Sequence, residues 1–170
     1  MSREEITFLQ RLGDPLDFSL ADARFALNAI GVKVVDREML PAFLFASPSN
    51  AWTPGFMVPG DVSLALWFPR AILIAGGPMA YVDELPLSGF VMAESRTLRE
   101  RLLGKATIMT LAADSPGSEP FVFMVALPPS VQYKAVGDRI VQAIDTARME
   151  AGLPKSLRLS GRLKRLLRMP

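Results

Sequence analysis

The chain contains neither cysteine nor histidine. The absence of cysteine excludes disulfide bonds, thiolate nucleophiles, and zinc or iron–sulfur centres held by thiolates. The absence of histidine removes the commonest general base and the commonest metal ligand of proteins. Ser-His-Asp, Cys-His and histidine–metal chemistry therefore cannot occur within this chain, and carboxylates remain as its credible acid–base groups.

Long apolar runs are also missing. The most apolar stretch, residues 56–82, is interrupted by prolines, glycines and the charged residues Asp61 and Arg70. A membrane helix needs about 20 consecutive apolar residues. The sequence begins MSREE, with acids where a secretory signal peptide has basic residues. We therefore expect no transmembrane segment and a cytoplasmic location.

The residues that are present suffice for one packed core. Of the 170 residues, 50% are hydrophobic, which excludes a fully disordered chain and fits a single domain with a short appendage. The formal net charge of +2 hides an uneven distribution, because the last 20 residues carry +6 without any acid and the first 150 carry −4. We therefore divide the chain into a compact domain, residues 1–154, and a basic tail, residues 155–170.

Two capping motifs predict helices near the N-terminus. Ser2 with Glu5, and Ser19 with Asp22, have the spacing at which a hydroxyl and a carboxylate each bond to the other's backbone N–H. Apolar residues at helical intervals follow each serine. We therefore expect one amphipathic helix after each of the two serines.

Apolar patterns predict strands in the middle of the chain. Residues 62–68 alternate with the period of a strand, and residues 71–75 form the continuous apolar run expected of a strand buried on both faces. Residues 32–35 are a further short strand candidate. Residues 47–55 are rich in serine, proline and asparagine, which predicts a loop that contains Trp52.

The second half begins with a basic segment. Ser95 precedes residues 96–103, which we predict to form a short basic helix. Residues 105–112 and 120–127 are apolar and are separated by turn-forming residues, which predicts a hairpin. A long amphipathic helix is predicted to begin after Ser130.

The order of these elements predicts the fold class. Strands are grouped along the chain instead of alternating one by one with helices, so we expect an α+β domain. We expect it to be a single domain with a mixed or antiparallel sheet covered by helices. A basic amphipathic helix is predicted to follow at the C-terminus.

The basic tail has a regular pattern. Its basic residues are Lys155, Arg158, Arg162, Lys164, Arg165 and Arg168. Four of them recur at spacings of three, four and three, which places one cationic stripe on a helix, opposite a stripe of leucines. Because neutralised phosphates release counterions, such a stripe favours a polyanion. We predict that these six residues bind a partner and that Arg96 and Arg99 extend the same positive surface.

Three interpretations of the tail remain open at this point. Its charges would pair with the acidic body as a solvated terminal helix, contact the phosphates of nucleic acid, or lie on an anionic membrane or in the groove of a partner protein. The tail contains no Phe, Tyr or Trp, so base stacking is not expected of it. Any contact with nucleic acid would therefore be to phosphate and only weakly sequence-specific.

The search for catalytic motifs gives weaker signals. Gly76 and Gly77 follow an apolar run as glycines do in nucleotide-binding loops, but neither G-x-G-x-x-G nor G-x-x-x-x-G-K-[ST] is present. We interpret them as a tight turn between strands. Acids such as Asp36, Asp83 and Glu84 are isolated along the chain, and we interpret them as exposed turn residues.

We therefore predict a small binding or assembly protein without a catalytic function or a cofactor. Its basic tail would engage nucleic acid or an acidic partner protein. The alternative is an enzyme that uses carboxylates and Mg²⁺ or Mn²⁺ on nucleic acid or a nucleotide. A further alternative is a structural subunit of a larger protein assembly, since the sequence leaves oligomerisation possible.

Overall fold

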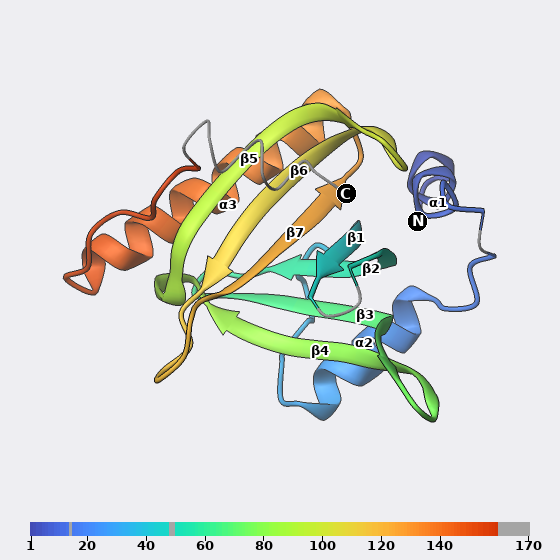
Figure 1. The fold of residues 1–170 in the computed structure, drawn as a ribbon, viewed down its shortest axis with the longest axis horizontal. Coiled ribbons are helices and arrows are strands. Elements are labelled where there is room, and N and C mark those ends of the chain that lie inside the picture. Colours follow the sequence, from blue (N-terminus) through green and yellow to red (C-terminus); the bar gives the residue numbers. More distant parts are fainter. Residues whose placement is uncertain (14, 48–49, 160–170) are drawn as a thin grey trace.

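The computed structural model describes residues 1–13, 15–47 and 50–159. Two helices, α1 (Arg3–Leu9) and α2 (Leu20–Ala29), precede the sheet (Figure 1). Both begin at the predicted capping boxes. In the first, the Glu5 backbone N–H donates to the Ser2 hydroxyl at 3.2 Å, and the Ser2 N–H donates to the Glu5 carboxylate at 2.7 Å. These two predictions are confirmed.

The described residues form a seven-stranded antiparallel sheet in the order β4-β3-β2-β1-β7-β6-β5. The strands are β1 (Leu40–Ala46), β2 (Trp52–Pro59), β3 (Ser63–Ile74), β4 (Gly77–Pro86), β5 (Phe90–Glu100), β6 (Gly104–Ala113) and β7 (Phe121–Leu127). Figure 1 shows that the sheet is strongly curled, so that β5, β6 and β7 cross the direction of β1 to β4. Of the two sheet types predicted, the antiparallel one is therefore observed.

Successive side chains of a strand point to opposite faces of the sheet, and both faces of this sheet carry apolar side chains. In β1, Leu44 belongs to one core cluster and the neighbouring Phe43 to the other. The first cluster also contains Ile140 and Ile144 of the long helix α3 (Val131–Glu150), which contacts β5 and β6. The second contains residues of α1 and α2, among them Phe8. Helices thus pack against both clusters, and the long helix predicted after Ser130 is confirmed.

The predicted hairpins and turns near the sheet are mostly confirmed. β6 and β7 pair antiparallel over residues 107–113 and 121–127, as the sequence predicts for a hairpin. Gly77 adopts a φ of +113°, which glycine tolerates, and closes the turn between β3 and β4. The interpretation of the two glycines as a turn is therefore correct.

The basic helix predicted over residues 96–103 is wrong. These residues continue β5 as far as Glu100 and pair in register with β6, with Arg96 opposite Ile108 and Leu98 opposite Ala106. Leu98 and Ile108 both pack on the second core cluster. Pairing with the apolar β6 thus overrides the local helix signal, because helix propensity is a weak preference next to tertiary packing.

Four further expectations about the sheet are wrong. Trp52 begins β2 instead of lying in a loop, and residues 32–35 form no strand. The proline at 69 does not end the strand, because β3 continues to Ile74 after a shift of register. Residues 71–75 are not buried on both faces, since Leu73 and Ile74 are 68% and 53% exposed. They lie where the β3–β4 hairpin extends beyond the core.

Candidate basic binding surface

Four exposed basic residues lie along the last part of the β5–β6 hairpin, near its turn. They are Arg96, Arg99, Arg101 and Lys105, which we call the basic hairpin. Arg99 and Lys105 lie directly opposite each other in the antiparallel pairing. Like charges in that position destabilise a sheet, so this pair is a feature that packing and stability do not explain.

The hydrogen bonds that fix the turn of the basic hairpin use its nearby acid and add a further cation. Gly104 adopts a φ of +74° at the turn. The nearest acid, Glu100, accepts the backbone N–H groups of Leu102 and Leu103 at 2.6 and 2.7 Å. The guanidinium of Arg11 donates to the carbonyl oxygens of Leu103 and Lys105 at 2.8 and 2.6 Å. The Glu100 carboxylate therefore accepts hydrogen bonds from the turn, and Arg11 adds a fifth positive charge near the hairpin.

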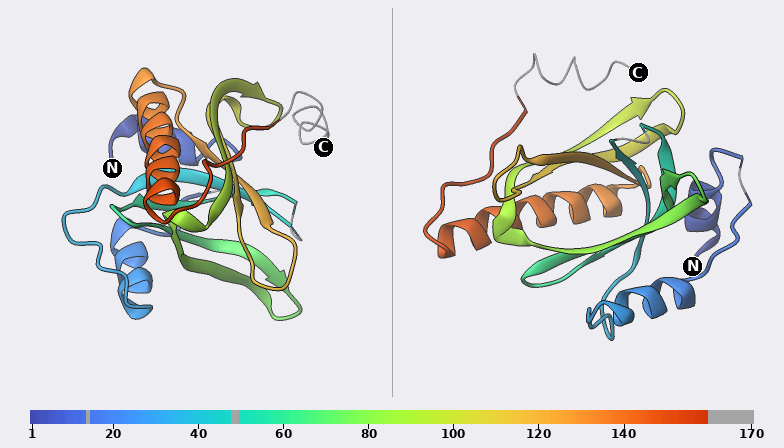
Figure 2. Two further views of the ribbon diagram at one scale, coloured as in Figure 1. Left: turned by 90° about the vertical axis from the view of Figure 1, so that its left-hand side faces the viewer. Right: turned by 60° about the horizontal axis from the view of Figure 1, so that its bottom comes forward.

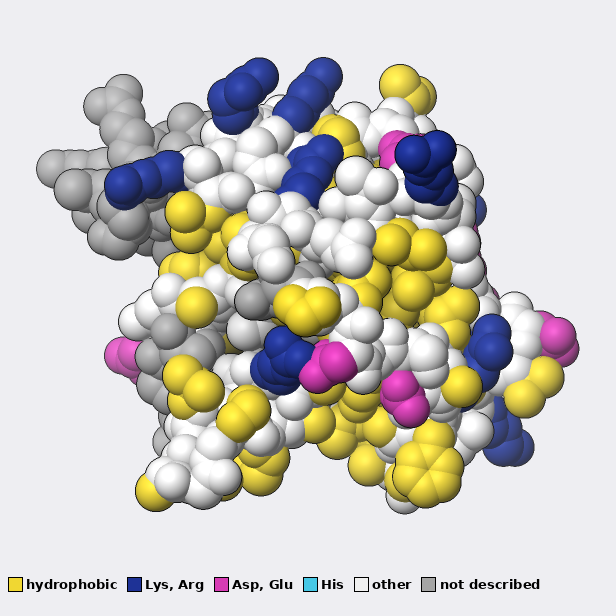
Figure 3. Space-filling model, turned by 90° about the vertical axis from the view of Figure 1, so that its right-hand side faces the viewer, with side chains coloured by type: hydrophobic (Ala, Val, Ile, Leu, Met, Phe, Trp, Pro, Cys, Tyr) yellow, Lys and Arg dark blue, Asp and Glu magenta, His cyan; other side chains and the backbone are white. Residues whose placement is uncertain are grey.

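Most of the positive charge is free for a partner. Arg96 lies 3.3 Å from a carboxylate oxygen of Glu94, which offsets its charge in part. Arg99, Arg101 and Lys105 form no ion pair with any residue that the structure describes. In Figure 3 several Lys and Arg side chains gather at the top of the face shown, with few acids among them. This end of the molecule therefore presents a cationic surface to solvent.

The start of the basic tail lies beside the same strand. After α3 the chain turns back and runs along β5 (Figure 2), where Leu157 pairs in parallel with Met92. The Leu157 N–H donates to the Val91 carbonyl at 2.9 Å, and the Ala93 N–H donates to the Leu157 carbonyl at 3.1 Å. Because the pairing is parallel, the chain at Arg158 is directed toward the basic hairpin.

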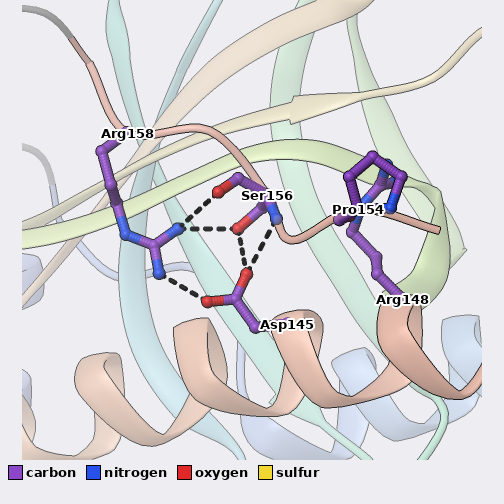
Figure 4. Close-up of polar contacts among 5 residues, drawn as sticks. All are labelled: Asp145, Arg148, Pro154, Ser156 and Arg158. Atoms are coloured by element: carbon purple, nitrogen blue, oxygen red, sulfur yellow. Dashed lines mark hydrogen bonds and ion pairs between the residues drawn. The ribbon is translucent and has the colours of Figure 1, made fainter.

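A set of hydrogen bonds fastens this segment to α3 (Figure 4). Arg158 Nη2 donates to a carboxylate oxygen of Asp145 at 2.6 Å, and its Nη1 donates to the hydroxyl of Ser156 at 2.7 Å. The Ser156 hydroxyl and N–H both donate to the other carboxylate oxygen of Asp145, at 2.5 and 2.9 Å. We call Asp145, Ser156 and Arg158 the tail clasp.

The tail clasp is reinforced by charge and by a buried arginine. Partial burial would raise the pKa of Asp145, but hydrogen bonds from Ser156 and Arg158 outweigh it and lower that pKa below its ordinary value. Arg148 is only 7% exposed, and its guanidinium donates to the carbonyl oxygens of Pro154 and Ser88 at 2.7 and 2.9 Å. The segment is thus fixed between α3 and the edge of the sheet.

The structure sorts the predicted tail residues into three groups. Lys155 is exposed, as a binding residue requires. Arg158 is bound to Asp145, which is the pairing with the body that one of the three interpretations expects. Arg162, Lys164, Arg165 and Arg168 lie outside the described residues. Residues 155–159 are extended and not helical, so the basic C-terminal helix stays a prediction only for residues 160–170.

Arg96 and Arg99 lie on β5, the strand with which Leu157 of the tail pairs, and not on a helix. The tail clasp was missed because Asp145 is separated from its partners by a turn of the chain, and helical spacing placed it on the outward face of α3. The contribution of Arg11 was missed for the same reason. Its contacts with residues 103 and 105 depend on tertiary folding.

The carboxylates that the structure describes are not grouped as metal ligands. Among the described residues no group of three or more acids lies close enough to hold a metal ion. Glu84 accepts the Ser63 hydroxyl at 2.5 Å, and Asp83 accepts the Tyr81 hydroxyl at 3.2 Å. Burial of the Tyr81 hydroxyl, together with the neighbouring Asp83 carboxylate, raises the pKa of Tyr81 well above its ordinary value. These acids therefore take part in hydrogen bonds along and between the strands.

In the part of the chain described, no helix combines the length and apolar character that spanning a bilayer requires.

Comparison with known proteins adds likeness of structure only. No family model and no curated protein matches the chain. A chain from the complex of the PDZ-RhoGEF DH/PH domains with GTP-γ-S-activated RhoA is 13% identical with a TM-score of 0.43; the match covers 84% of this chain and 36% of that one. The hSac2 domain from the human phosphoinositide phosphatase Sac2 is 13% identical with a TM-score of 0.44, and the match covers 85% and 92% of the two chains. The function is therefore argued from the surface itself.

Proposed function

We propose that this chain is a small non-catalytic binding module whose basic hairpin, together with the basic tail, engages the phosphate backbone of nucleic acid. The observation that carries the proposal is the cross-strand pair of Arg99 and Lys105 at a turn whose acid is already bound by backbone N–H groups. A sheet keeps such a pair at a cost in stability. A polyanion that bridges both cations offsets this cost.

The arrangement of charge supports a phosphate backbone over a single small anion. Arg99 and Lys105 point to the same face of the hairpin and Arg101 follows at its turn, so neighbouring phosphates would meet these three side chains, whereas Arg96 projects from the opposite face of β5. The described part of the tail runs in the same direction along β5, and four further basic residues follow residue 159 in the sequence. Binding by this surface is expected to depend strongly on salt and weakly on sequence.

An acidic partner protein is the second candidate for the same surface. The observation in its favour is Leu102, which is 62% exposed at the tip of the turn between Arg101 and Leu103. An exposed apolar side chain among cations is suited to a protein surface that offers both acids and an apolar contact. No observation favours the metal-dependent enzyme.

The experiment measures DNA and RNA binding by fluorescence anisotropy over a series of salt concentrations. The variant Arg99→Gln/Arg101→Gln should weaken binding and reduce the slope of log K against log salt by about one for each lost phosphate contact. The matched control Lys33→Gln/Arg139→Gln removes two exposed charges elsewhere and should leave the slope nearly unchanged. Deleting residues 160–170, which leaves the tail clasp in place, should lower the slope further.

Equal affinities and slopes for wild type, hairpin variant and truncated chain would overturn the proposal. Binding to polyglutamate or to vesicles containing phosphatidylserine, without binding to either nucleic acid, would also overturn it. The first of those results would select the acidic protein partner instead.

A further inference from the structure

A hollow of about 430 Å³ lies between α2 and the loop that leads to β1. It is lined by Arg24, Asn28, Val34, Val35, Asp36 and Arg37. In Figure 1 α2 lies below the sheet, whereas the end of the basic hairpin lies at the top. The hollow is therefore distinct from the surface proposed above to bind nucleic acid.

The two guanidinium groups in this hollow have no acidic partner. Neither Arg24 nor Arg37 forms an ion pair or a side-chain hydrogen bond with any described residue. Asp36 lines the same hollow but lies within ion-pair distance of neither arginine. The lining therefore keeps a net positive charge that nothing in the described chain neutralises.

The Arg37 side chain is held by packing. Its Nη1 is shielded from solvent and has no hydrogen-bond partner among the described residues. Its other terminal nitrogen, Nη2, lies against Gly60, where an added Cβ would be 2.4 Å away. A partly buried guanidinium without an acid is costly, because its N–H groups lose water without gaining an acceptor. Because Nη1 is shielded, only the part of Arg37 that lines the hollow is open to an anion.

We propose that this hollow binds a small phosphate monoester. Arginine recognises a phosphate through the paired N–H donors of its guanidinium group, and Arg24 and Arg37 line the same hollow. The amide of Asn28 adds a further donor, and the carboxylate of Asp36 accepts hydroxyl groups from the carbon skeleton. The volume is in the range of small-ligand sites.

Glycerol 3-phosphate is the probe for the first test. Isothermal titration calorimetry and thermal unfolding should show saturable binding and a rise in Tm that sodium chloride at the same ionic strength does not give. Arg24→Gln and Arg37→Gln should each weaken binding at least about tenfold, as expected for the loss of a charge-assisted hydrogen bond. Lys33→Gln, in the same loop but outside the lining, should bind as the wild type does.

A further variant keeps the charge of Arg37 but changes the position of its guanidinium group. Gly60 has no left-handed backbone conformation, but an added Cβ would lie 2.4 Å from Arg37 Nη2 and 3.1 Å from the Ser63 carbonyl oxygen. Gly60→Ala should therefore displace the Arg37 guanidinium and weaken the binding of glycerol 3-phosphate without removing an arginine. Circular dichroism checks that each variant is folded. Stabilisation no greater than that by chloride, or affinities unchanged in the Arg24, Arg37 and Gly60 variants, would overturn the site. The variant Arg99→Gln/Arg101→Gln should bind the probe normally, which separates this site from the basic hairpin.

Discussion

Tyr133 on α3 donates a hydrogen bond of 2.7 Å from its hydroxyl to the carboxylate of Glu5 on α1, 128 positions earlier in the chain. The same carboxylate closes the capping box of α1 with Ser2. Burial would raise the pKa of Glu5, but the hydrogen bonds from Tyr133 and Ser2 lower it below its ordinary value. One ionised carboxylate thus caps a helix and joins the two ends of the domain.

The Tyr133→Phe variant should lose about 1 kcal/mol of unfolding free energy at neutral pH, the usual contribution of such a hydrogen bond. A carboxyl group with a lowered pKa stabilises the fold above its unfolded-state pKa and loses that effect as the pH falls through the lower folded-state value. The difference between wild type and variant should therefore shrink in acid. Urea unfolding at several pH values measures it. Tyr81→Phe, whose hydroxyl bonds within its own strand, is the control.

Gly137→Ala should destabilise the protein although alanine is the better helix former. Propensity alone would favour alanine by about 1 kcal/mol within a helix. Here α3 approaches β5 so closely that the new Cβ would lie 2.3 Å from the Ser95 hydroxyl oxygen. Overpacking of this kind costs about 1–3 kcal/mol. Thermal unfolding measures the change.

The same contact gives a double-mutant test. The Ser95 hydroxyl is shielded and has no hydrogen-bond partner in the described chain, so Ser95→Ala should be neutral or stabilising. In the Ser95→Ala/Gly137→Ala protein the shortest clash is gone, and most of the lost stability should return. Strictly additive effects would show that the oxygen is not the obstacle.

Asp145→Asn should loosen the tail clasp. The substitution removes the charge that binds Arg158, and amide hydrogen exchange at Ser156 and Leu157 should become faster, while exchange in the middle of α3 stays slow. Asp138→Asn, which breaks an exposed pair with Lys134, should leave these two amides unchanged. Because the pKa of Asp145 is lowered, wild type should show the same loosening only as the pH falls through that lowered value.

Arg99→Thr should stabilise the hairpin and weaken binding at once. Removing one of two like charges that face each other across strands is expected to gain about 0.2–1 kcal/mol, and threonine suits a strand. The loss of a phosphate contact would reduce the affinity for nucleic acid. Chemical unfolding and anisotropy measure the two effects. A variant that loses both stability and affinity would show that Arg99 supports the fold instead.

The parts of the fold that follow local rules could be predicted from the sequence. The capping boxes at Ser2 and Ser19 and the hairpin of β6 and β7 depend on residues close together in the chain. The wrong helix over residues 96–103 shows the opposite case. Its serine and arginines satisfy local helix rules, but the strand partner that decides its conformation lies in β6. A strand pairing of this kind is decided by packing that no single segment reveals.

The sequence predicts which basic residues belong to the candidate surface, but not how they are arranged in space. Arg96 and Arg99 were identified because basic residues can be counted, and the sequence shows equally that Arg101 and Lys105 are near them. That Arg99 faces Lys105 depends on the register of two strands. The anion hollow around Arg24 and Arg37 has no sequence signal at all. It arises where α2 meets the loop that leads to β1.

The parallel pairing of Leu157 with Met92 has a consequence for aggregation. β5 is an edge strand, and a free edge with apolar residues invites pairing with another copy of the chain. The returning segment occupies this edge at Val91 and Ala93, and Arg96 and Arg99 lie further along the same strand. The charges that we assign to a partner therefore also repel a second sheet, so neutralising them would expose the protein to self-association unless its partner were bound.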